Sequence, residues 1–548
     1  MNSLSEALDS LHSWLARATA TPVVLSPYAN PRSPFWRPYL RWVLVPTFLF
    51  FCFCYGFYHA LSAPYLLVPM MFPVAVLAMV AIWALPDSRY APTGGLEAMF
   101  FAFSSGLIMW PNYLALSLPG LPWITMIRLI GFPMALLLLV SVSVSKQVRG
   151  ELRTALATMP PVVIFLIMFI AIQFLTIPLS DHPQDTLSKV VLAQVSWTAM
   201  FFAGCYVFLK PGRPERWAVL LWVMSILIGI IGFMEGRQGQ VLWVGHIPGF
   251  LTIEDETVQR ILGGQQRAAI GVHRVQATFS TSLGLAEFLA LCVPFIIHFA
   301  FGPYRLAIRI ASGLSIPFLL YIVLITDSRL GLVGFLLGYL IYMFFWAALR
   351  WRRSKESIFG PAITLAYPVI FTLAITATFF VGRIRNAIWG TGASQASTEG
   401  RISQYQNAIP MILKNPFGHG MGQGAETLGQ RNPAGILTID TYYMLIGLEY
   451  GLLGIVAFYG MLIAAIYYTG KYAIIMIPSN NDTALLMPLS VALVNFLVIK
   501  AVFSQQDNHP LIFMMIGMGA ALVYRVKTEN AQRGGLSAGT KPVPTARL

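Results

Sequence analysis

Residues 440–468 read DTYYMLIGLEYGLLGIVAFYGMLIAAIYY and decide the class of fold. The run is apolar over more than the roughly 20 residues that an α-helix needs to cross the hydrocarbon core of a bilayer. Its apolar side chains follow one another without the alternation of a strand in a membrane barrel. Because lipid leaves only helices and closed barrels as spanning structures, the run predicts a membrane-spanning helix.

A long polar segment, residues 382–441, leads into this helix. A connection of that length is usually functional or disordered. Helical spacing in ISQYQNAIPMIL, residues 402–413, argues against disorder and predicts a loop that is partly helical. Basic side chains outnumber acidic ones in this segment, so we interpret it as a cationic shelf on the membrane surface.

The rest of the chain repeats the apolar pattern. It has 548 residues, of which 57% are hydrophobic and 11% charged, and its mean hydropathy is +0.69. Soluble domains do not have that composition, so we predict an all-α, polytopic membrane helix bundle of about fourteen transmembrane helices. The expected spans are residues 43–61, 64–85, 97–115, 124–145, 159–178, 190–209, 217–234, 281–301, 305–325, 330–349, 361–381, 442–468, 484–504 and 510–524.

The formal net charge of the chain is +14. In a membrane protein such an excess more often reflects positively charged cytoplasmic loops than a nucleic-acid partner, and we expect no nucleic acid here. Basic clusters in residues 146–153, 210–216 and 350–356 and from residue 525 onward place those segments, and both termini, in the cytoplasm. Two large charged loops, 235–280 and 382–441, then face the opposite side.

These assignments divide the chain into a tail (residues 1–42), a transmembrane domain (residues 43–524) and a second cytoplasmic tail (residues 525–548). The first tail fits an interfacial helix over residues 1–20 or a frayed end. The second is rich in Gly, Ser, Pro and Thr and is predicted to be disordered. The cysteines lie in apolar segments without metal-ligand spacing, as small packed residues do. They are Cys52, Cys54, Cys205 and Cys292.

Four charged residues fall inside the expected spans: Arg128, Glu287, Glu449 and Lys500. Charges within a membrane are costly and are functional candidates by default. Each lies in the half of its span nearest the outward loops, whereas secondary transporters tend to bind substrates near the midplane. The alternative is structural: the two glutamates pair with Lys500 or Arg128 and lock helices together.

Three arginines mark the outward side: Arg274 before a span, Arg329 in the short turn TDSRLG, and Arg401 in the large loop. Guanidinium groups bind phosphate through two parallel hydrogen bonds and stay charged when partly desolvated, which predicts an anion site. Contact with lipid headgroups is the alternative for each. NPFGHGMGQG, residues 415–424, predicts a tight turn that permits close backbone approach, with His419 either structural or catalytic.

Four stretches, in this order, resemble the O-antigen ligase/polymerase superfamily of bacterial envelope enzymes. They are ATFSTSLGLAEFLALCVPF with the preceding Arg274, TDSRLGLVGFLLG, GRISQYQNAIPMILKNPFGHGMGQG, and DTYYMLIGLEYGLLG. The resemblance covers roughly residues 270–470. It departs from the ligases at Asp440 and Thr441, which stand where ligases carry His and Asn, and that histidine is the expected catalytic residue of ligases. An Asp there favours a polymerase of O-antigen or exopolysaccharide over a ligase; a glycan transporter is the third reading.

The family reaction that this resemblance implies transfers a glycan from undecaprenyl pyrophosphate to an acceptor hydroxyl, at the periplasmic face of the bacterial inner membrane. Arg274, Arg329 and Arg401 are then expected to stabilise the charge that develops on the pyrophosphate. Asp440 is the first candidate for general base and His419 the second. We expect inversion at the anomeric carbon, and neither a metal nor another cofactor.

Substrate contacts are expected from aromatic rings that can stack on sugar faces, although interfacial aromatics are common at this depth. The candidates are Tyr405, Tyr442, Tyr443 and Trp389, and Glu449 and His419 complete the expected substrate-binding set. The expected partners are lipid-linked glycans as donor and acceptor, the bilayer itself, and a protein that regulates chain length or exports the polymer.

Overall fold

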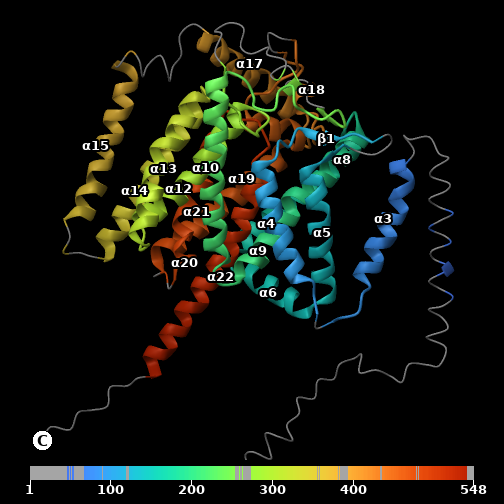
Figure 1. Ribbon diagram of the computed structural model, residues 1–548, viewed down its shortest axis with the longest axis horizontal. Coiled ribbons are helices and arrows are strands. Elements are labelled where there is room, and N and C mark those ends of the chain that lie inside the picture. Colours follow the sequence, from blue (N-terminus) through green and yellow to red (C-terminus); the bar gives the residue numbers. More distant parts are fainter. Residues whose placement is uncertain are drawn as a thin grey trace, which may run out of the picture. The chain divides into compact units, whose positions relative to one another are not determined.

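The computed structural model describes residues 67–88, 90–118, 123–253, 273–353, 358–380, 393–431, 435–476 and 480–539, with a few single residues between them (Figure 1). The chain separates into two compact units. Residues Met1–Val74 with Pro119–Leu121 form one, and Ala75–Leu118 with Pro122–Leu548 form the other. The sites analysed below lie in the second unit, and the predicted N-terminal tail and interfacial helix lie outside the described residues.

The described residues are predominantly helical, which confirms the predicted all-α membrane class, and ten helical segments are long and apolar enough to cross a bilayer. The predicted number of about fourteen is not confirmed. The ten segments are α5 (Met126–Val144), α7 (Pro160–Leu175) with η2 (Ile177–Leu179), α8 (Pro183–Ala193) continued by the π-turn η3 (Gln194–Thr198) and α9 (Ala199–Leu209), α10 (Arg213–Gln238), α12 (Ser282–Phe301), α13 (Leu306–Ile325), α14 (Arg329–Arg353), α19 (Tyr442–Ile475), α20 (Asn481–Ala484) with α21 (Leu486–Ile499), and α22 (His509–Gly539).

Shorter elements complete the described fold. Apolar helices α3 (Leu67–Trp83), α4 (Thr93–Met109) and α15 (Phe359–Phe380) coincide with expected spans, and α6 (Lys146–Leu156) is amphipathic. A small antiparallel sheet pairs β1 (Leu114–Leu116) with both β2 (Ile124–Thr125) and β3 (Leu251–Ile253). The large polar loop contains α17 (Ala393–Lys414) and α18 (Gly424–Leu428), as its helical spacing predicts.

Helices α12 and α22 form the most deeply buried part of the bundle. Small residues let their neighbours approach: a Cβ atom at Gly517 of α22 would overlap the carbonyl oxygen of Phe201 in α9, and one at Gly331 of α14 would overlap Ala286 in α12. In lipid, the hydrophobic effect does not drive helices together, so close packing through small residues stabilises their contacts instead. The buried Cys205 and Cys292 fit this packing role.

One end of the bundle gathers the basic clusters that we predict to be cytoplasmic. The Asp482 carboxylate accepts hydrogen bonds from the backbone N–H groups of Gly212 (2.6 Å) and Glu215 (3.1 Å), and from Arg525 Nη1 (2.9 Å). It therefore caps the N-terminus of α10 from another helix and neutralises an arginine of α22. Three segments far apart in sequence meet at this side chain.

The α6 region carries a partly exposed ion-pair cluster around Asp87. Asp87 lies 2.6 Å from Arg149 Nη2 and 3.2 Å from Lys146 Nζ. The hydrogen bond from Arg149, followed by that from Lys146, holds the pKa of the Asp87 carboxyl below its usual value.

At the opposite end, Glu235 in the last turn of α10 fixes the segment that leads into α12. Its buried carboxylate accepts hydrogen bonds from the N–H groups of Gln276 (3.0 Å) and Ala277 (2.7 Å), and it lies 2.8 Å from His273 Nε2. Thr278 Oγ1 donates to the carbonyl of Ile108, where α4 ends, at 2.6 Å. Figure 1 shows α17 and α18 at one end of the long helices and α20 and α6 at the other.

Two of the four in-span charges pair with each other. Lys500 Nζ lies 3.0 Å from Glu287 Oε1, and both side chains are completely buried. This confirms the structural alternative for these two residues. Arg128 instead donates to the carbonyl of Trp123, and Glu449 has a different partner that is described below.

Helix α22 continues to Gly539, through much of the range for which composition predicts a disordered tail. The helix is already formed within the bundle, so later residues extend it without a new nucleation cost. Arg525 Nη2 lies 3.7 Å from Glu529, an i,i+4 pair that supports this extension. Residues 540–548 lie outside the described part of the chain.

We predict that Asp482→Ala lowers the free energy of unfolding in detergent by about 3–5 kcal/mol, because it leaves the buried Arg525 without its main counter-ion. Asp482→Asn keeps one oxygen that can accept from a backbone N–H group of α10, so it is expected to cost less than the alanine. The measurement is denaturant unfolding of the purified protein. Asp87→Ala, which breaks ion pairs that are more exposed than that of Asp482, is the matched control, and equal losses for the two alanine variants would contradict the assignment.

Candidate functional site

Helix α19 is interrupted at Gly451, whose φ of 67° and ψ of −166° are not helical. The interruption leaves the carbonyl groups of the preceding turn without their usual partners four residues later. The glycine-rich loop takes their place. His419 N donates to the carbonyl of Leu448 (2.9 Å), Gly420 N to that of Glu449 (3.0 Å), and Leu452 N to that of Pro416 (3.0 Å). We refer to residues 416–422, docked in this break, as the loop plug.

Glycine is required on both sides of this junction. Gly418, Gly420 and Gly422 have φ values of 84°, 96° and 81°, in the left-handed region that favours glycine. A Cβ atom at Gly418 would overlap the backbone of Glu449, and one at Gly451 would overlap the carbonyl of Pro416. The prediction of a tight turn with close backbone approach is therefore confirmed for residues 415–424.

Glu449 supports the loop plug from below. Its side chain is 1% exposed, and Oε1 accepts a hydrogen bond from Gly422 N at 2.8 Å. Lys189 Nζ of α8 donates to the carbonyl of Gly422 at 3.3 Å and brings a positive charge to the same turn. Glu449 is therefore buried beneath the loop plug, whereas the sequence predicts that this residue contacts the substrate.

His419 lies at the tip of the loop plug and is partly buried. Its Nδ1 is 3.1 Å from the carbonyl oxygen of Leu448. Because a carbonyl only accepts, this contact requires the proton on Nδ1, and it leaves Nε2 as a hydrogen-bond acceptor in the neutral ring. His419 can therefore act as a base only through Nε2.

Asp440 lies immediately before the N-terminus of α19, beside α17. Its backbone N–H donates to Oε1 of Gln404 at 2.9 Å, and Gln404 is buried in α17. The side chain of Asp440 is partly exposed. A carboxylate within hydrogen-bond reach of an acceptor hydroxyl can act as a general base.

Arg401 is one turn before Gln404 on α17, so the helix brings it to the same face as the Asp440 contact. Its Nε is buried and has no hydrogen-bond partner among the described residues. A buried N–H of a charged group without a partner is costly, and it marks a position where an anionic ligand would be stabilising.

Arg274 and Arg329 lie together at the turn between α13 and α14. Arg274 Nε donates to the carbonyl of Thr326 (3.0 Å) and Nη2 to that of Asp327 (3.1 Å), and Nε lies 4.0 Å from Asp327 Oδ2. Asp327 has a φ of 50°, and Ser328 Oγ accepts from Gly331 N at 3.1 Å to cap α14. Arg329 is the exposed first residue of that helix.

The segment between α21 and α22 contacts both the turn that carries Arg329 and the start of α19, near Asp440. Leu330, next to Arg329, packs with Val502 and Phe503. Two residues earlier in that segment, the Lys500 carbonyl accepts from Tyr442 N at 3.3 Å, directly beside Asp440. The Arg329 turn and the start of α19 therefore contact a common segment, and α17, which carries Arg401, is linked to it through the hydrogen bond between Gln404 and Asp440 N.

The predicted sugar-stacking tyrosines are placed differently from one another. Tyr442 is completely buried, with its ring centroid 4.7 Å from that of His509 and 5.2 Å from Lys500 Nζ. Tyr443 is partly buried and donates its hydroxyl to the carbonyl of Leu497 at 2.7 Å. Tyr405 is partly exposed on α17, and Trp389 lies outside the described residues. Burial gives Tyr442 a packing role in this structure.

The residues that hold the site in place were not singled out from the sequence. Gln404 follows Arg401 at helical i,i+3 spacing, a signal that could have identified it. A glycine inside an otherwise continuous apolar run, Gly451, was the available signal for the interrupted helix. Lys189 and Glu235 act only through segments distant in sequence, and no local pattern marks them. Within the described residues no group of three or more His, Cys, Asp or Glu could hold a metal ion.

Residues 286–459 match a family model described as O-Antigen ligase. These residues include most of α12, the Arg329 turn, α17, the loop plug and the part of α19 that contains the interruption. A protein of Salmonella muenchen named O-antigen polymerase is 29% identical over 198 residues, which cover 34% of this chain and 45% of that protein. The alignment thus spans less than half of the relative's length. The match confirms the resemblance read from the four motifs: this part of the chain is similar to the O-antigen ligase/polymerase proteins.

Proposed function

We propose that this protein is a polymerase of undecaprenyl-pyrophosphate-linked oligosaccharide repeat units, acting at the periplasmic face of the bacterial inner membrane. The observation that supports it best is the junction of α17 with α19. There the buried Nε of Arg401 has no hydrogen-bond partner among the described residues, and Asp440 N donates to Oε1 of Gln404, one turn further along α17. The naming of the Salmonella relative as an O-antigen polymerase favours the same class.

In the proposed reaction, a sugar hydroxyl of the acceptor attacks the anomeric carbon of the donor glycan. The new glycosidic C–O bond forms as the bond between that carbon and the pyrophosphate oxygen breaks, with inversion at the carbon. The hydroxyl proton passes to the carboxylate of Asp440, and undecaprenyl pyrophosphate leaves with the bonding electron pair. His419 Nε2 is the second candidate for the base.

Negative charge grows on the departing pyrophosphate, and fixed guanidinium groups would stabilise it. Arg401 offers its buried Nε for this purpose. Arg329 is exposed at the start of α14, and Arg274 holds the adjacent turn through two backbone carbonyls. Within the proposed site, Arg274 therefore orients the turn that carries Arg329, and Arg329 and Arg401 approach the anion. No metal ion takes part in this scheme.

A ligase is the second candidate, favoured by the description of the matching family model. In that case the acceptor is lipid A-core or a protein. A transporter is the third, and an interrupted helix is a feature of transporter sites. In this protein, however, the loop plug occupies the interruption in α19 with its own backbone.

An assay of the purified protein with lipid-linked oligosaccharide, in the presence of EDTA, distinguishes these three classes of function. A polymerase lengthens the glycan on its lipid carrier. A ligase transfers it only to an added lipid A-core or protein acceptor. Movement of the glycan across proteoliposome membranes without bond formation would identify a transporter and overturn the proposal.

We predict that Asp440→Asn lowers the transfer rate by about 10²–10⁴-fold, because the amide cannot accept the proton of the acceptor hydroxyl. The backbone hydrogen bond to Gln404 does not use the substituted group, so folding is expected to be preserved. The measurement is single-turnover transfer with saturating substrates. Asp440→Glu is the matched control and should retain part of the activity. Full activity in Asp440→Asn would remove Asp440 as the base, and His419→Gln would then test the second candidate.

We predict that Arg401→Ala and Arg329→Ala each lower the transfer rate by about 10²–10³-fold, since each removes a fixed charge from the developing anion. Arg431→Ala is the control: it removes an exposed arginine of the same polar loop, whose Nη1 donates to the carbonyl of Gly435. Equal activities for Arg401→Ala, Arg431→Ala and the unsubstituted protein would eliminate the α17 part of the pyrophosphate site.

A further inference from the structure

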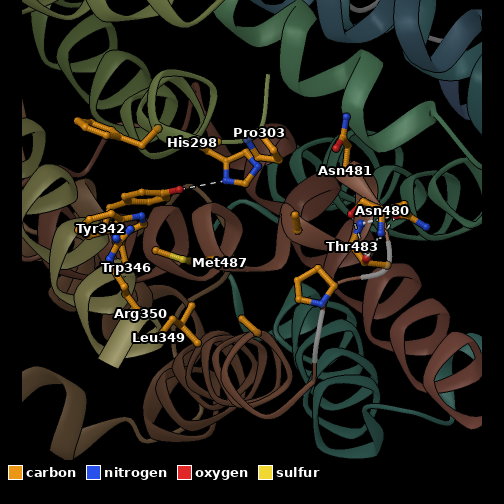
Figure 2. A pocket seen from close by; sticks show the side chains of 15 residues that line it. His298, Pro303, Tyr342, Trp346, Leu349, Arg350, Asn480, Asn481, Thr483 and Met487 are labelled. Atoms are coloured by element: carbon orange, nitrogen blue, oxygen red, sulfur yellow. Dashed lines mark hydrogen bonds between the residues drawn. The ribbon is translucent and has the colours of Figure 1, made fainter. Parts of the chain in front are cut away.

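A second polar site lies at the opposite end of the bundle from Asp440. It is a cavity of about 500 Å³ between the C-terminal ends of α12 and α14 and the segment from Pro478 to Met487. Figure 2 shows Tyr342, Trp346 and Arg350 along one side and Asn480, Asn481 and Thr483 across from them. The cavity adjoins Asp482, which ties together the segments that we predict to be cytoplasmic.

His298 supplies a polar group whose hydrogen-bonding capacity is half used. The side chain is 6% exposed, and its Nδ1 lies 3.0 Å from the hydroxyl of Tyr342 (Figure 2). Its Nε2 is buried and has no hydrogen-bond partner among the described residues. His298 is one of the residues that line the cavity, and a desolvated polar atom is stabilised when a ligand supplies the missing partner.

Other polar groups of the wall are already engaged. Asn480 Nδ2 donates to Glu529 (3.1 Å), and Asn481 Nδ2 donates to Glu215 (3.0 Å). Thr483 forms a capping box with Asn480 at the start of α20. His298 is therefore the wall residue with an unused, buried polar atom.

Arg350 adds a positive charge at the rim. It is exposed, and its guanidinium lies 5.5 Å from the ring centroid of Trp346. No carboxylate within the described part of the chain forms an ion pair with it. Stacking on an indole keeps a guanidinium planar and oriented while its N–H groups stay available to an anion.

The remaining wall is apolar. Leu349 and Met487 line the cavity, and Phe301 at the end of α12 lines it while remaining 45% exposed. The site therefore combines one cation and one buried polar atom with an apolar surface that opens toward the outside of the bundle. That combination suits an amphiphile better than a free ion. Basic pockets between membrane helices on the cytoplasmic side recognise anionic lipid headgroups in this way.

We propose that this cavity binds the phosphate headgroup of an anionic glycerophospholipid from the adjacent leaflet. The phosphate lies against the Arg350 guanidinium, His298 Nε2 hydrogen-bonds an oxygen of the headgroup, and the start of an acyl chain lies along Phe301 and Leu349. Because this site is separate from the glycan-transfer end, its occupancy is tested by lipid binding and does not depend on the proposed activity.

The test is native mass spectrometry of the full-length protein in detergent, titrated with phosphatidylglycerol. We expect the unsubstituted protein to retain one lipid, and Arg350→Ala to bind it about tenfold more weakly, which corresponds to the loss of one charge-assisted contact. Arg350→Lys should be intermediate, because it keeps the charge without the planar fork. His298→Gln is expected to weaken binding severalfold. Arg350 is exposed, so its variants test the site even if the buried His298 variant fails to fold.

Arg352→Ala is the matched control: it removes an exposed arginine from the same end of α14 that does not line the cavity. Phosphatidylcholine and inorganic phosphate are the control ligands. Equal retention of phosphatidylglycerol by Arg350→Ala and Arg352→Ala would overturn the proposal. Equally strong binding of phosphatidylcholine would also overturn it, as would equally strong binding of inorganic phosphate alone. Either result would show that the cavity does not select an anionic lipid.

Discussion

The proposed site depends on a backbone junction: the loop plug docked into the interruption of α19. A membrane helix cannot leave backbone groups unpaired in a low-dielectric interior, because each would cost several kcal/mol. The break at Gly451 persists because residues 416–420 supply the missing donors and acceptor from outside the helix. Glu449 completes the junction with a hydrogen bond to Gly422. The polar loop is therefore tied to the bundle by main-chain hydrogen bonds, and α17 leads directly into that junction.

The bundle keeps its two ends chemically distinct. Carboxylates work as caps and counter-ions at one end, where Asp482 joins α10, α20 and α22. At the other end, Glu235 performs a comparable task for the chain that leads into α12. At this same end, the buried pair of Lys500 and Glu287 fixes the start of α12 against the end of α21. Such a pair adds little net stability, but it is costly to break on one side only, which specifies how the helices meet.

This arrangement fits a reaction at a membrane surface. The proposed donor is a lipid diphosphate, so its leaving group stays anchored in the bilayer while the sugar projects above it. Arg274 and Arg329 are held at the turn between two spans, and Arg401 lies on a helix of the polar loop. A site assembled from both kinds of element can approach the diphosphate from the membrane side and the glycan from the aqueous side.

The membrane class, the partial helicity of the polar loop and the glycine-rich turn were predictable from the sequence, because each follows from local composition or spacing. Helical periodicity in residues 402–413 is a property of neighbouring residues, and α17 confirms it. The family resemblance followed from four motifs in order, each legible without a structure. The number of spans is different: the sequence predicts about fourteen, and ten described helical segments are long and apolar enough to cross a bilayer. Hydropathy alone does not define where one helix ends and the next begins.

The pairing of the charges and the accessibility of the tyrosines depend on contacts between helices that are distant in sequence. Lys500 and Glu287 are more than 200 residues apart by their numbers, and their pairing depends on how α12 packs against α21. Tyr442 and Tyr443 are adjacent in sequence, yet the first is buried against His509 and the second reaches a carbonyl of α21. Neighbours on a helix point about 100° apart, so packing against distant helices separates their environments in a way that local sequence cannot specify.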